Sequence, residues 1–447
     1  MRNFNKRIVL TILVTFLTIV CTQAQKAKPY FIVDNEKVNI NTLESEIKRL
    51  MKEVGIAGLS LAVINKGQEV YYNAFGEKSL EERGEKINKE TIFEACSLSK
   101  SFTVYAAYRM VDLGLLALDK PLYEYYKYKP LEHDERYKKI TARMVLSHNS
   151  GIENHQGKND PEVLEIVANP GEKFVYSGEG YTFLANVIKD LVEEEAIEDL
   201  MKNYVYKPLG LKRTYTTAVG DGNINYAKPH NVFGEVINKG RNKKPDLAGR
   251  IHSNAHDYGM LMSQLFVKKN LTKERMLSPT TRMRNDRELF YGPGFEILYT
   301  SNDTLLLQGG NNNGFKGLAC YSLNKDCGFV FFANSDRAEM LGVAINELTI
   351  KSQISEYYKG IVYTNQSPNK ANEIFSLYRT KGAKETKKKL TKIFNEKEKV
   401  FTSNDIIDLV YYLKDREYEI AKYIADKYTT TYPDPNLNFL YSRWLTK

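Results

Sequence analysis

The sequence predicts an α+β fold, in which an antiparallel sheet is flanked by helices and carries a helical subdomain. Strand-like segments occur near both ends of the first 360 residues, and the pattern between them is that of helices and loops. Strands at both ends of a region pair most simply into one sheet, with the intervening helices beside it. Beyond residue 360 the composition shifts to Lys, Glu and Tyr at helical spacing, which predicts a C-terminal α-helical appendage.

Hydrophobic periodicity and turn residues place the individual elements. The expected strands are Ile56–Asn65, Glu69–Phe75, Phe295–Tyr299, Thr304–Leu307, Phe315–Leu323 and Gly328–Ala333. The expected helices are Leu43–Val54, the run that starts at Phe102, and one long helix over Arg337–Tyr358. Helices and loops fill residues 121–280, where Asn-Ser-Gly, Asn-Pro-Gly and Gly-Asp-Gly mark turns. A functional site is expected at the seam between the sheet and these helices.

The first 24 residues have the pattern of a secretory signal. A basic start is followed by the apolar stretch Ile8–Val20 and by the small-residue cleavage site Thr22-Gln23-Ala24. The stretch is about 13 residues, shorter than the roughly 20 that span a bilayer. We therefore expect export to the periplasm or the exterior without a stable membrane span, and favour cleavage over lipoprotein anchoring through Cys21. The domains are then residues 25–360 and a helical region, 361–447.

The net charge of +9 comes partly from a lysine-rich run in the C-terminal region. Its members are Lys384, Lys387, Lys388, Lys389 and Lys392. Interleaved glutamates at helical spacing predict a solvated helix face, so we expect no nucleic-acid partner. Residues 411–441 resemble a tetratricopeptide repeat with its proline between units, but the region holds fewer than the three repeats usually needed for stability. A protein partner of these helices and a helical tail without one both stay open.

Three cysteines remain after removal of the signal segment. Cys320 and Cys327 flank a turn between two expected strands, so a disulfide across the hairpin and two free thiols are both open. Cys96 is expected to be a small packing residue.

Ser97-Leu98-Ser99-Lys100 is the candidate nucleophile motif. The same Ser-x-x-Lys spacing also begins at Ser45, Ser322 and Ser367, so the spacing alone identifies nothing. The copy at Ser97 differs because it opens an apolar helical run, and one helical turn brings the amine of Lys100 within reach of the Ser97 hydroxyl. Such a pair can form an activated nucleophile, and an ordinary helix N-cap is the alternative.

Further motifs follow in order along the chain. They are Leu146-Ser-His-Asn-Ser-Gly-Ile152, Tyr176-Ser177-Gly178, Lys207-Pro-Leu-Gly-Leu211, Ala248-Gly-Arg-Ile-His-Ser253 and the glycine-rich strand Gln308-Gly309-Gly310-Asn311. With Ser97-x-x-Lys100, this order resembles the serine β-lactamase and penicillin-binding-protein superfamily, nearest its class C β-lactamase, D-aminopeptidase and esterase branch. The resemblance covers about residues 40–358.

The resemblance implies a β-lactamase/transpeptidase-like fold and a serine hydrolase that forms an acyl-enzyme. Ser97 would attack a carbonyl carbon, Lys100 would take or steer its proton, and Tyr176 would shuttle a proton to the leaving group and activate water. The backbone N–H groups of Ser97 and Asn311 would form the oxyanion hole. No metal or organic cofactor is implied.

Two departures from the family pattern concern the expected substrate-binding positions. Gly178 stands where the family has the Asn of Tyr-x-Asn, and Gln308-Gly309-Gly310 replaces Lys-Thr-Gly or His-x-Gly. The cation that would bind a substrate carboxylate is absent, so a neutral ester or amide is expected rather than efficient hydrolysis of β-lactams. The alternatives are a peptidase for D-amino-acid or cell-wall peptides, and a catalytically inactive binding protein of the same fold.

Histidine pairs raise the question of a metal site. His148 and His155 lie in a turn-rich segment, and His252 and His256 are four residues apart, but no acidic metal-ligand pattern accompanies either pair. We expect His148 to cap its loop and expect no metal. The substrate is expected to be a small molecule or a peptide.

Overall fold

The computed structural model describes residues 29–81, 84–154, 163–217, 225–239, 244–267, 277, 281–358, 370–396, 401 and 403–431. The expected signal segment, Cys21, His155 and the proline-containing end of the repeat-like segment lie outside these residues.

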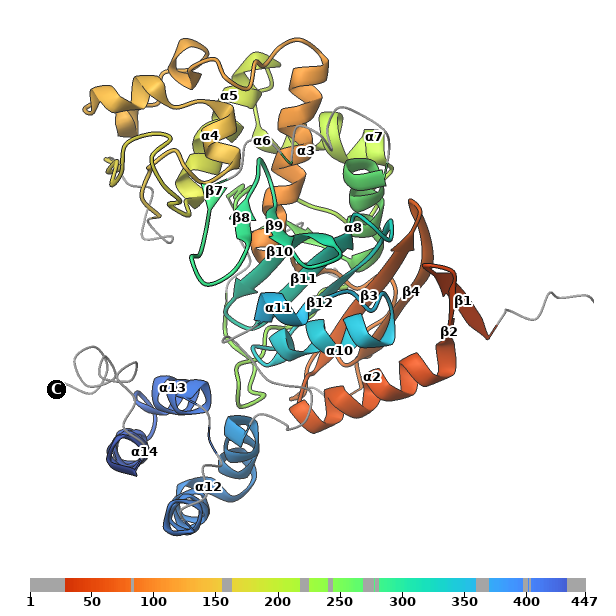
Figure 1. The fold of residues 1–447 in the computed structure, drawn as a ribbon, viewed down its shortest axis with the longest axis vertical. Coiled ribbons are helices and arrows are strands. Elements are labelled where there is room, and N and C mark those ends of the chain that lie inside the picture. Colours follow the sequence, from red (N-terminus) through yellow and green to blue (C-terminus); the bar gives the residue numbers. More distant parts are fainter. Residues whose placement is uncertain are drawn as a thin grey trace, which may run out of the picture.

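One eight-stranded antiparallel sheet forms the centre of the molecule, with strand order β4-β3-β12-β11-β10-β9-β8-β7 (Figure 1). Its strands are β3 (Gly58–Asn65), β4 (Gln68–Gly76), β7 (Thr281–Arg282), β8 (Leu289–Tyr291), β9 (Glu296–Tyr299), β10 (Thr304–Asn312), β11 (Phe315–Ser322) and β12 (Cys327–Ala333). The pairing of β3 with β12 joins the two ends of the domain and confirms the predicted fold class. Two-stranded sheets pair β1 (Tyr30–Val33) with β2 (Glu36–Asn39), and β5 (Phe93–Glu94) with β6 (His252–Ser253).

Side chains that alternate along the strands supply two separate hydrophobic cores. On β3, Leu61 and Val63 face one core, whereas Ala62 and Ile64 face the other, as the two-residue period of a strand requires. Helices α2 (Ile40–Val54) and α10 (Leu341–Leu348) pack in the first core, and α3 (Ser99–Asp112) and α8 (Ala255–Met262) pack in the second (Figure 1). Both faces of the sheet are therefore covered.

The segment between α3 and β6 forms the predicted helical subdomain, whose helices lie on both sides of α3 in Figure 1. Its helices are α4 (Ala142–Leu146), α5 (Gly178–Leu191), α6 (Ile197–Met201) and α7 (Lys207–Leu209), with the π-helical turn η5 (Lys202–Tyr206). The 3-10 turns are η2 (Leu122–Glu124), η3 (Lys129–Leu131) and η4 (Glu135–Lys139). A second π-helical turn, η6 (Ser263–Val267), follows α8.

The prediction of one long helix over Arg337–Tyr358 is wrong. This segment forms the 3-10 turn η7 (Ala338–Met340), α10, and the short helix α11 (Ser355–Tyr358). The side chain of Asn346 donates to the carbonyl of Ser352 at 2.9 Å and accepts from its N–H at 3.1 Å. These local bonds offer the backbone an alternative to the helix.

Cys320 and Cys327 are free and buried, so the structure does not contain the disulfide that the sequence left open. The register explains this, because Cys327 lies opposite Ser322 and Cys320 lies opposite Phe329. Burial raises the pKa of the Cys327 thiol to about 12, as expected for an unreactive packing residue.

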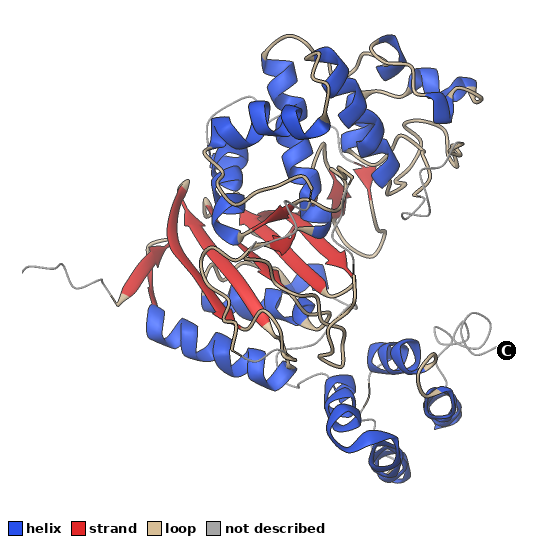
Figure 2. Cartoon of the chain, turned by 180° about the vertical axis from the view of Figure 1, so that it is seen from behind, coloured by secondary structure: helices blue, strands red, loops and turns tan. Residues whose placement is uncertain are grey.

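The C-terminal helices lie apart from the sheet (Figures 1 and 2). They contact the main domain at the loop that contains Val232 and Phe233 and at Arg337, whose guanidinium lies 5.8 Å from the Phe375 ring. They are α12 (Lys370–Asn395, kinked at Gly382), α13 (Ser403–Leu413) and α14 (Tyr418–Thr431). Their core includes Val232 and Phe233, which lie in a loop of the main domain between α7 and β6. The Phe233 ring packs 5.2 Å from the ring of Phe375, and Arg416 forms an ion pair with Glu235 at 2.7 Å.

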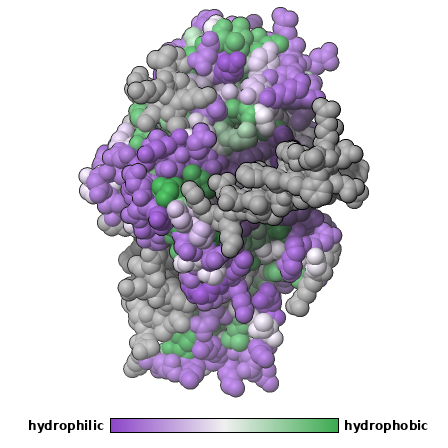
Figure 3. Space-filling model, turned by 90° about the vertical axis from the view of Figure 1, so that its right-hand side faces the viewer, coloured by the Kyte–Doolittle hydropathy of each residue, from purple (hydrophilic) through white to green (hydrophobic). Residues whose placement is uncertain are grey.

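Hydrophobic side chains gather inside the molecule rather than on its surface. The face seen in Figure 3 is mostly hydrophilic, with small separate hydrophobic groups. Among the described residues, no helix combines the length and the hydrophobicity that a membrane span requires.

Candidate active site

Ser97 lies in the 3-10 turn η1 (Cys96–Leu98), which leads directly into α3 below strand β10. Cys96 adopts a left-handed backbone conformation with φ of 52°, which is uncommon for a residue with a side chain and occurs often near active sites. A Cβ atom at Gly310 would lie 2.5 Å from Leu98 Cδ1 and 3.0 Å from the Ala95 carbonyl oxygen. The absence of a side chain at position 310 therefore lets η1 contact β10 and determines how close Ser97 lies to this strand.

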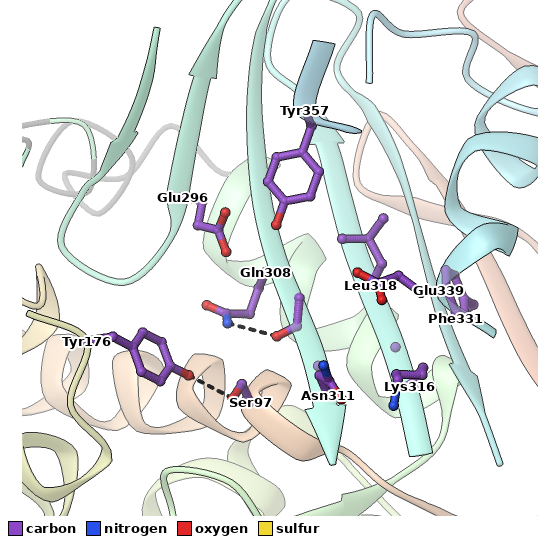
Figure 4. Close-up of a pocket in the computed structure, with 13 residues that line it drawn as sticks. Ser97, Tyr176, Glu296, Gln308, Asn311, Lys316, Leu318, Phe331, Glu339 and Tyr357 are labelled. Atoms are coloured by element: carbon purple, nitrogen blue, oxygen red, sulfur yellow. Dashed lines mark hydrogen bonds between the residues drawn. The ribbon is translucent and has the colours of Figure 1, made fainter. Parts of the chain in front are cut away.

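The structure brings Ser97, Lys100 and Tyr176 together. The Ser97 hydroxyl and the Tyr176 hydroxyl lie 2.7 Å apart, and Lys100 Nζ lies 3.4 Å from Ser97 Oγ (Figure 4 shows the first pair). Lys100 also donates to the carbonyl of Ala248 at 2.6 Å and is 2% exposed. Its Nζ lies 4.7 Å from the centre of the Tyr176 ring, so the ammonium charge can stabilise negative charge on the phenol.

Contacts of Ser177 and His148 fix the position of Tyr176. Ser177 caps α5, because its hydroxyl accepts from the N–H of Gly180 at 3.0 Å. The Ser177 N–H donates to Nδ1 of His148 at 3.1 Å, and the His148 ring lies 4.3 Å from the Tyr176 ring. Burial and the nearby charge of Lys100 hold the pKa of His148 well below its usual range, so the imidazole is neutral. Since Nδ1 accepts, the geometry assigns the proton to Nε2.

A cavity of about 310 Å³ opens beside Ser97. It is lined by Ser97, Tyr176, Glu296, Gln308, Gly309, Gly310, Asn311, Lys316, Gly317, Leu318, Phe331, Glu339 and Tyr357 (Figure 4). Strand β9 pairs with β10 only over Thr304–Leu307, so the edge of β10 from Gln308 onward is left open toward Ser97. This open edge belongs to the cavity.

The expected substrate-binding residues separate into two groups. Gln308, Gly309, Gly310 and Asn311 line the cavity, and Asn311 lies opposite Lys316 in the strand register. Gly178 does not belong to the lining, and its N–H donates to Asn154 Oδ1 at 3.0 Å.

Gln308 is fixed by its neighbours and stays neutral. Its side-chain oxygen accepts from the Tyr291 hydroxyl at 2.9 Å, and its amide donates to the carbonyl of Gly309 at 3.1 Å. The side chain thus occupies the position of the family's cation without supplying a charge.

Several residues of this site were missed at the level of sequence. Glu296, Lys316, Glu339 and Tyr357 line the cavity, and His148 contacts Tyr176. Burial raises the pKa of Glu296 to about 7, against the opposing effect of a hydrogen bond with Tyr357. Glu296 and Lys316 could not be recognised from the sequence, because a single charged residue within a strand forms no motif. His148 had a signal in the motif Leu146-Ser-His-Asn-Ser-Gly-Ile152, which we interpreted only as a loop cap.

His252 and His256 contact neighbouring side chains. The His252 ring lies 5.3 Å from the Tyr226 ring, and His256 Nδ1 lies 2.8 Å from Glu69 Oε2. In the part of the chain that the structure describes, no three His, Cys, Asp or Glu side chains gather as a metal site would require.

The fold and sequence have many relatives. The family model described as "Beta-lactamase" matches residues 43–351. "Beta-lactamase-like protein 4" of Dictyostelium discoideum is 24% identical over 321 residues, which cover 61% of this chain and 55% of that protein. The chain thus spans about half the length of that relative.

Solved structures show the same architecture. The octameric penicillin-binding protein homologue from Pyrococcus abyssi superposes with a TM-score of 0.59 at 22% identity, covering 72% of this chain and 81% of that one. EstCE1, described as a hydrolase with promiscuous acyltransferase activity, gives a TM-score of 0.60 at 18% identity, covering 70% and 98%. The fold is therefore that of β-lactamases and penicillin-binding proteins, as the motif order predicted. Because the family model matches more than half of its residues, this chain belongs to the β-lactamase family.

Proposed function

We propose that this protein is an exported serine hydrolase that cleaves an ester or amide through an acyl-enzyme and is not an efficient β-lactamase. The observation that carries the proposal is the 2.7 Å contact between the Ser97 and Tyr176 hydroxyls at the wall of the cavity, with Lys100 beside them. A nucleophile within hydrogen-bond reach of its base, and that base beside a fixed charge, is the arrangement that covalent catalysis requires.

Acylation begins when Ser97 Oγ attacks the substrate carbonyl carbon and loses its proton to Tyr176, which acts as a phenolate in this step. Tyr176 is the closer acceptor, because Lys100 lies 3.4 Å away and already donates to the carbonyl of Ala248. The oxyanion of the tetrahedral intermediate rests on the backbone N–H groups of Ser97 and Asn311. When the intermediate collapses, the bond to the leaving group breaks and Tyr176 returns the proton to that group.

In deacylation water takes the place of Ser97 as the nucleophile, and Tyr176 is again the base. A water molecule attacks the acyl ester and loses a proton to Tyr176. The bond between the acyl carbon and Ser97 Oγ then breaks, and Tyr176 passes the proton to Ser97, which restores the hydroxyl and releases the free acid. Lys100 Nζ lies beside the Tyr176 ring, where it stabilises negative charge on the Tyr176 oxygen.

The preference against β-lactams rests on Gln308. A β-lactam carries a carboxylate, and Gln308 provides no cation because its amide is neutral and committed to Tyr291 and Gly309. An unpaired carboxylate in a partly desolvated site loses binding energy.

Hydrolysis of p-nitrophenyl butyrate tests the proposal. We expect Ser97→Ala to lower kcat/KM by roughly a thousandfold or more, and Tyr176→Phe by roughly a hundredfold. Ser45→Ala is the matched control, since Ser45 begins another Ser-x-x-Lys copy on the surface of α2, and it should retain the wild-type rate. Turnover of a chromogenic cephalosporin should stay near the Ser97→Ala background. Equal rates for wild type and Ser97→Ala would exclude the mechanism and favour a binding protein.

Export is part of the same proposal. The protein recovered from the periplasm or the medium should begin at Gln25, whereas retention of the first 24 residues would contradict it.

A further inference from the structure

The cavity continues past the reacting groups around the open edge of β10. Gly309 has no side chain, and the space beside it is open. A Cβ atom at this position would lie 3.8 Å from the Tyr357 hydroxyl, its nearest neighbour. We call this region the outer arm and define it by Glu296, Gly309, Leu318, Glu339 and Tyr357. In Figure 4, Glu296 and Tyr357 point toward each other beside Gln308, and Ser97 lies below them.

Two acidic side chains, Glu296 and Glu339, lie in the outer arm. Lys316 is the basic residue in the cavity lining, and its ammonium forms an ion pair with Asp336 at 2.6 Å. Both side chains of that pair are less than one tenth exposed, so its charge is compensated within the protein. The carboxyls of Glu296 and Glu339 remain. Burial raises the pKa of both, against the opposing charge of Lys316 at Glu339, so a bound cation would favour their charged forms.

Glu296 has no cation to balance it in the described ranges. The hydroxyl of Tyr357 bonds to its carboxyl, and the amide of Gln308 is occupied by Tyr291 and Gly309. Desolvation raises the pKa of the Glu296 carboxyl, which means that the fold disfavours its charge until a cation arrives. A substrate cation would compensate the carboxylate, and a substrate carboxylate would be repelled.

We propose that the outer arm binds an ammonium group of the substrate, held by Glu296 with support from Glu339, so that the enzyme selects cationic esters or amides over neutral and anionic ones. This inference rests on the proposed hydrolase function, because the arm opens from the cavity that contains Ser97. It reverses the charge preference of a site built for carboxylate-bearing substrates.

Binding to the Ser97→Ala protein tests this inference separately from catalysis. Two probe series, each with a cationic, a neutral and an anionic member, are titrated by calorimetry at pH 8. The leaving-group series consists of butyryl thioesters of thiocholine, 3,3-dimethylbutanethiol and 3-mercaptopropionate. The acyl-side series consists of p-nitroanilides of 6-aminohexanoate, heptanoate and adipate. In at least one series, the cationic member should bind about tenfold more tightly than the neutral one, and the anionic member most weakly.

The carboxyl variants identify the source of the preference. Glu296→Gln should lower the cation-to-neutral ratio about fivefold or more, and Glu296→Gln with Glu339→Gln should remove it, while the affinity for the neutral probe stays unchanged. Glu288→Gln is the control, because Glu288 is an exposed carboxyl paired with Arg282 outside the cavity. Equal affinities across both series, tighter binding of an anion, or a cation preference that survives the double variant would overturn the inference. Since Ser97→Ala has no turnover to measure, these outcomes are independent of whether wild-type protein hydrolyses any probe.

Discussion

At the scale of single residues, the candidate site depends on contacts that fix a proton carrier. Ser97 and Lys100 were predicted because one helical turn separates them, and Tyr176 because the order of motifs resembles that of the family. Glu296 could not be predicted, since its environment is created by Tyr357 and Gln308 from other parts of the chain. Local spacing identifies residues that share a helix, but it carries no information about which strand edge meets which distant helix.

His148 should act as a positioning residue for Tyr176. We expect His148→Ala to lower the free energy of unfolding by about 1–3 kcal/mol, because the buried N–H of Ser177 loses its acceptor. It should also lower kcat about tenfold with little change in KM for a short ester. Urea denaturation and steady-state kinetics measure the two effects.

His148→Asn separates backbone strain from the role of the ring. His148 has a φ of 51°, a conformation that asparagine tolerates better than alanine. The asparagine variant should recover part of the stability and retain the defect in kcat. Full recovery of kcat would mean that the imidazole ring has no role in placing Tyr176.

Glu296 should make stability depend on pH. Its pKa is about 7 in the fold against 4.5 ordinarily, so the folded protein holds this proton more tightly than the unfolded chain does. The free energy of unfolding should therefore fall as the pH rises from about 4.5 to 7, by about 1–2 kcal/mol after allowance for partial exposure. Urea denaturation at pH 5 and pH 8 should show that Glu296→Gln gains stability over wild type at the higher pH. An equal difference at both pH values would contradict this.

At the scale of elements, the sequence predicted the central sheet well because strands buried on both faces are nearly continuous apolar runs. The long helix expected over Arg337–Tyr358 was wrong, since the bonds between Asn346 and Ser352 compete with the helix in a way that periodicity does not reveal. The short strands β7 and β8 were missed, because two or three residues are too few to show alternation.

The contact between β10 and η1 should be intolerant of added volume. Gly310→Ala places a Cβ against Leu98 and the Ala95 carbonyl, so η1 must shift and move Ser97. We expect a loss of about 1–3 kcal/mol in stability and at least a tenfold loss in kcat/KM for a short ester. Gly309→Ala serves as the comparison for stability, because its Cβ has room, and it should unfold at nearly the wild-type urea concentration. Equal stability of the two variants would show that η1 does not depend on this contact.

At the scale of the whole molecule, the C-terminal helices pack around a separate core that includes Phe233 of the main domain, and Arg337 of the main domain also lies on the Phe375 ring. We propose residues 25–360 and 361–447 as the two domains, with the helical region as a site for a protein partner. Its similarity to a tetratricopeptide repeat stays a prediction. The lysine-rich face of α12 is exposed, in keeping with a solvated surface.

Phe233 should hold the C-terminal helices in place. Its ring is 3% exposed and packs against Phe375 and Arg416, so Phe233→Ala should weaken docking by about 3–5 kcal/mol. Hydrogen exchange should then become faster in α12–α14 and stay unchanged in the sheet. Glu235→Gln, which removes only a partly exposed ion pair, should cost less than about 1 kcal/mol. Unchanged exchange in Phe233→Ala would mean that the helices are held by other contacts.

The central claim is that Ser97 is the nucleophile, and covalent labelling tests it most directly. The wild-type protein is treated with a fluorophosphonate, its intact mass is measured, and the modified peptide is mapped. Ser97, Lys100 and Tyr176 together predict a single adduct on Ser97, slower labelling of Lys100→Met and Tyr176→Phe, and no adduct on Ser97→Ala. Absence of any adduct on the wild-type protein, or an adduct that persists in Ser97→Ala, would contradict the account.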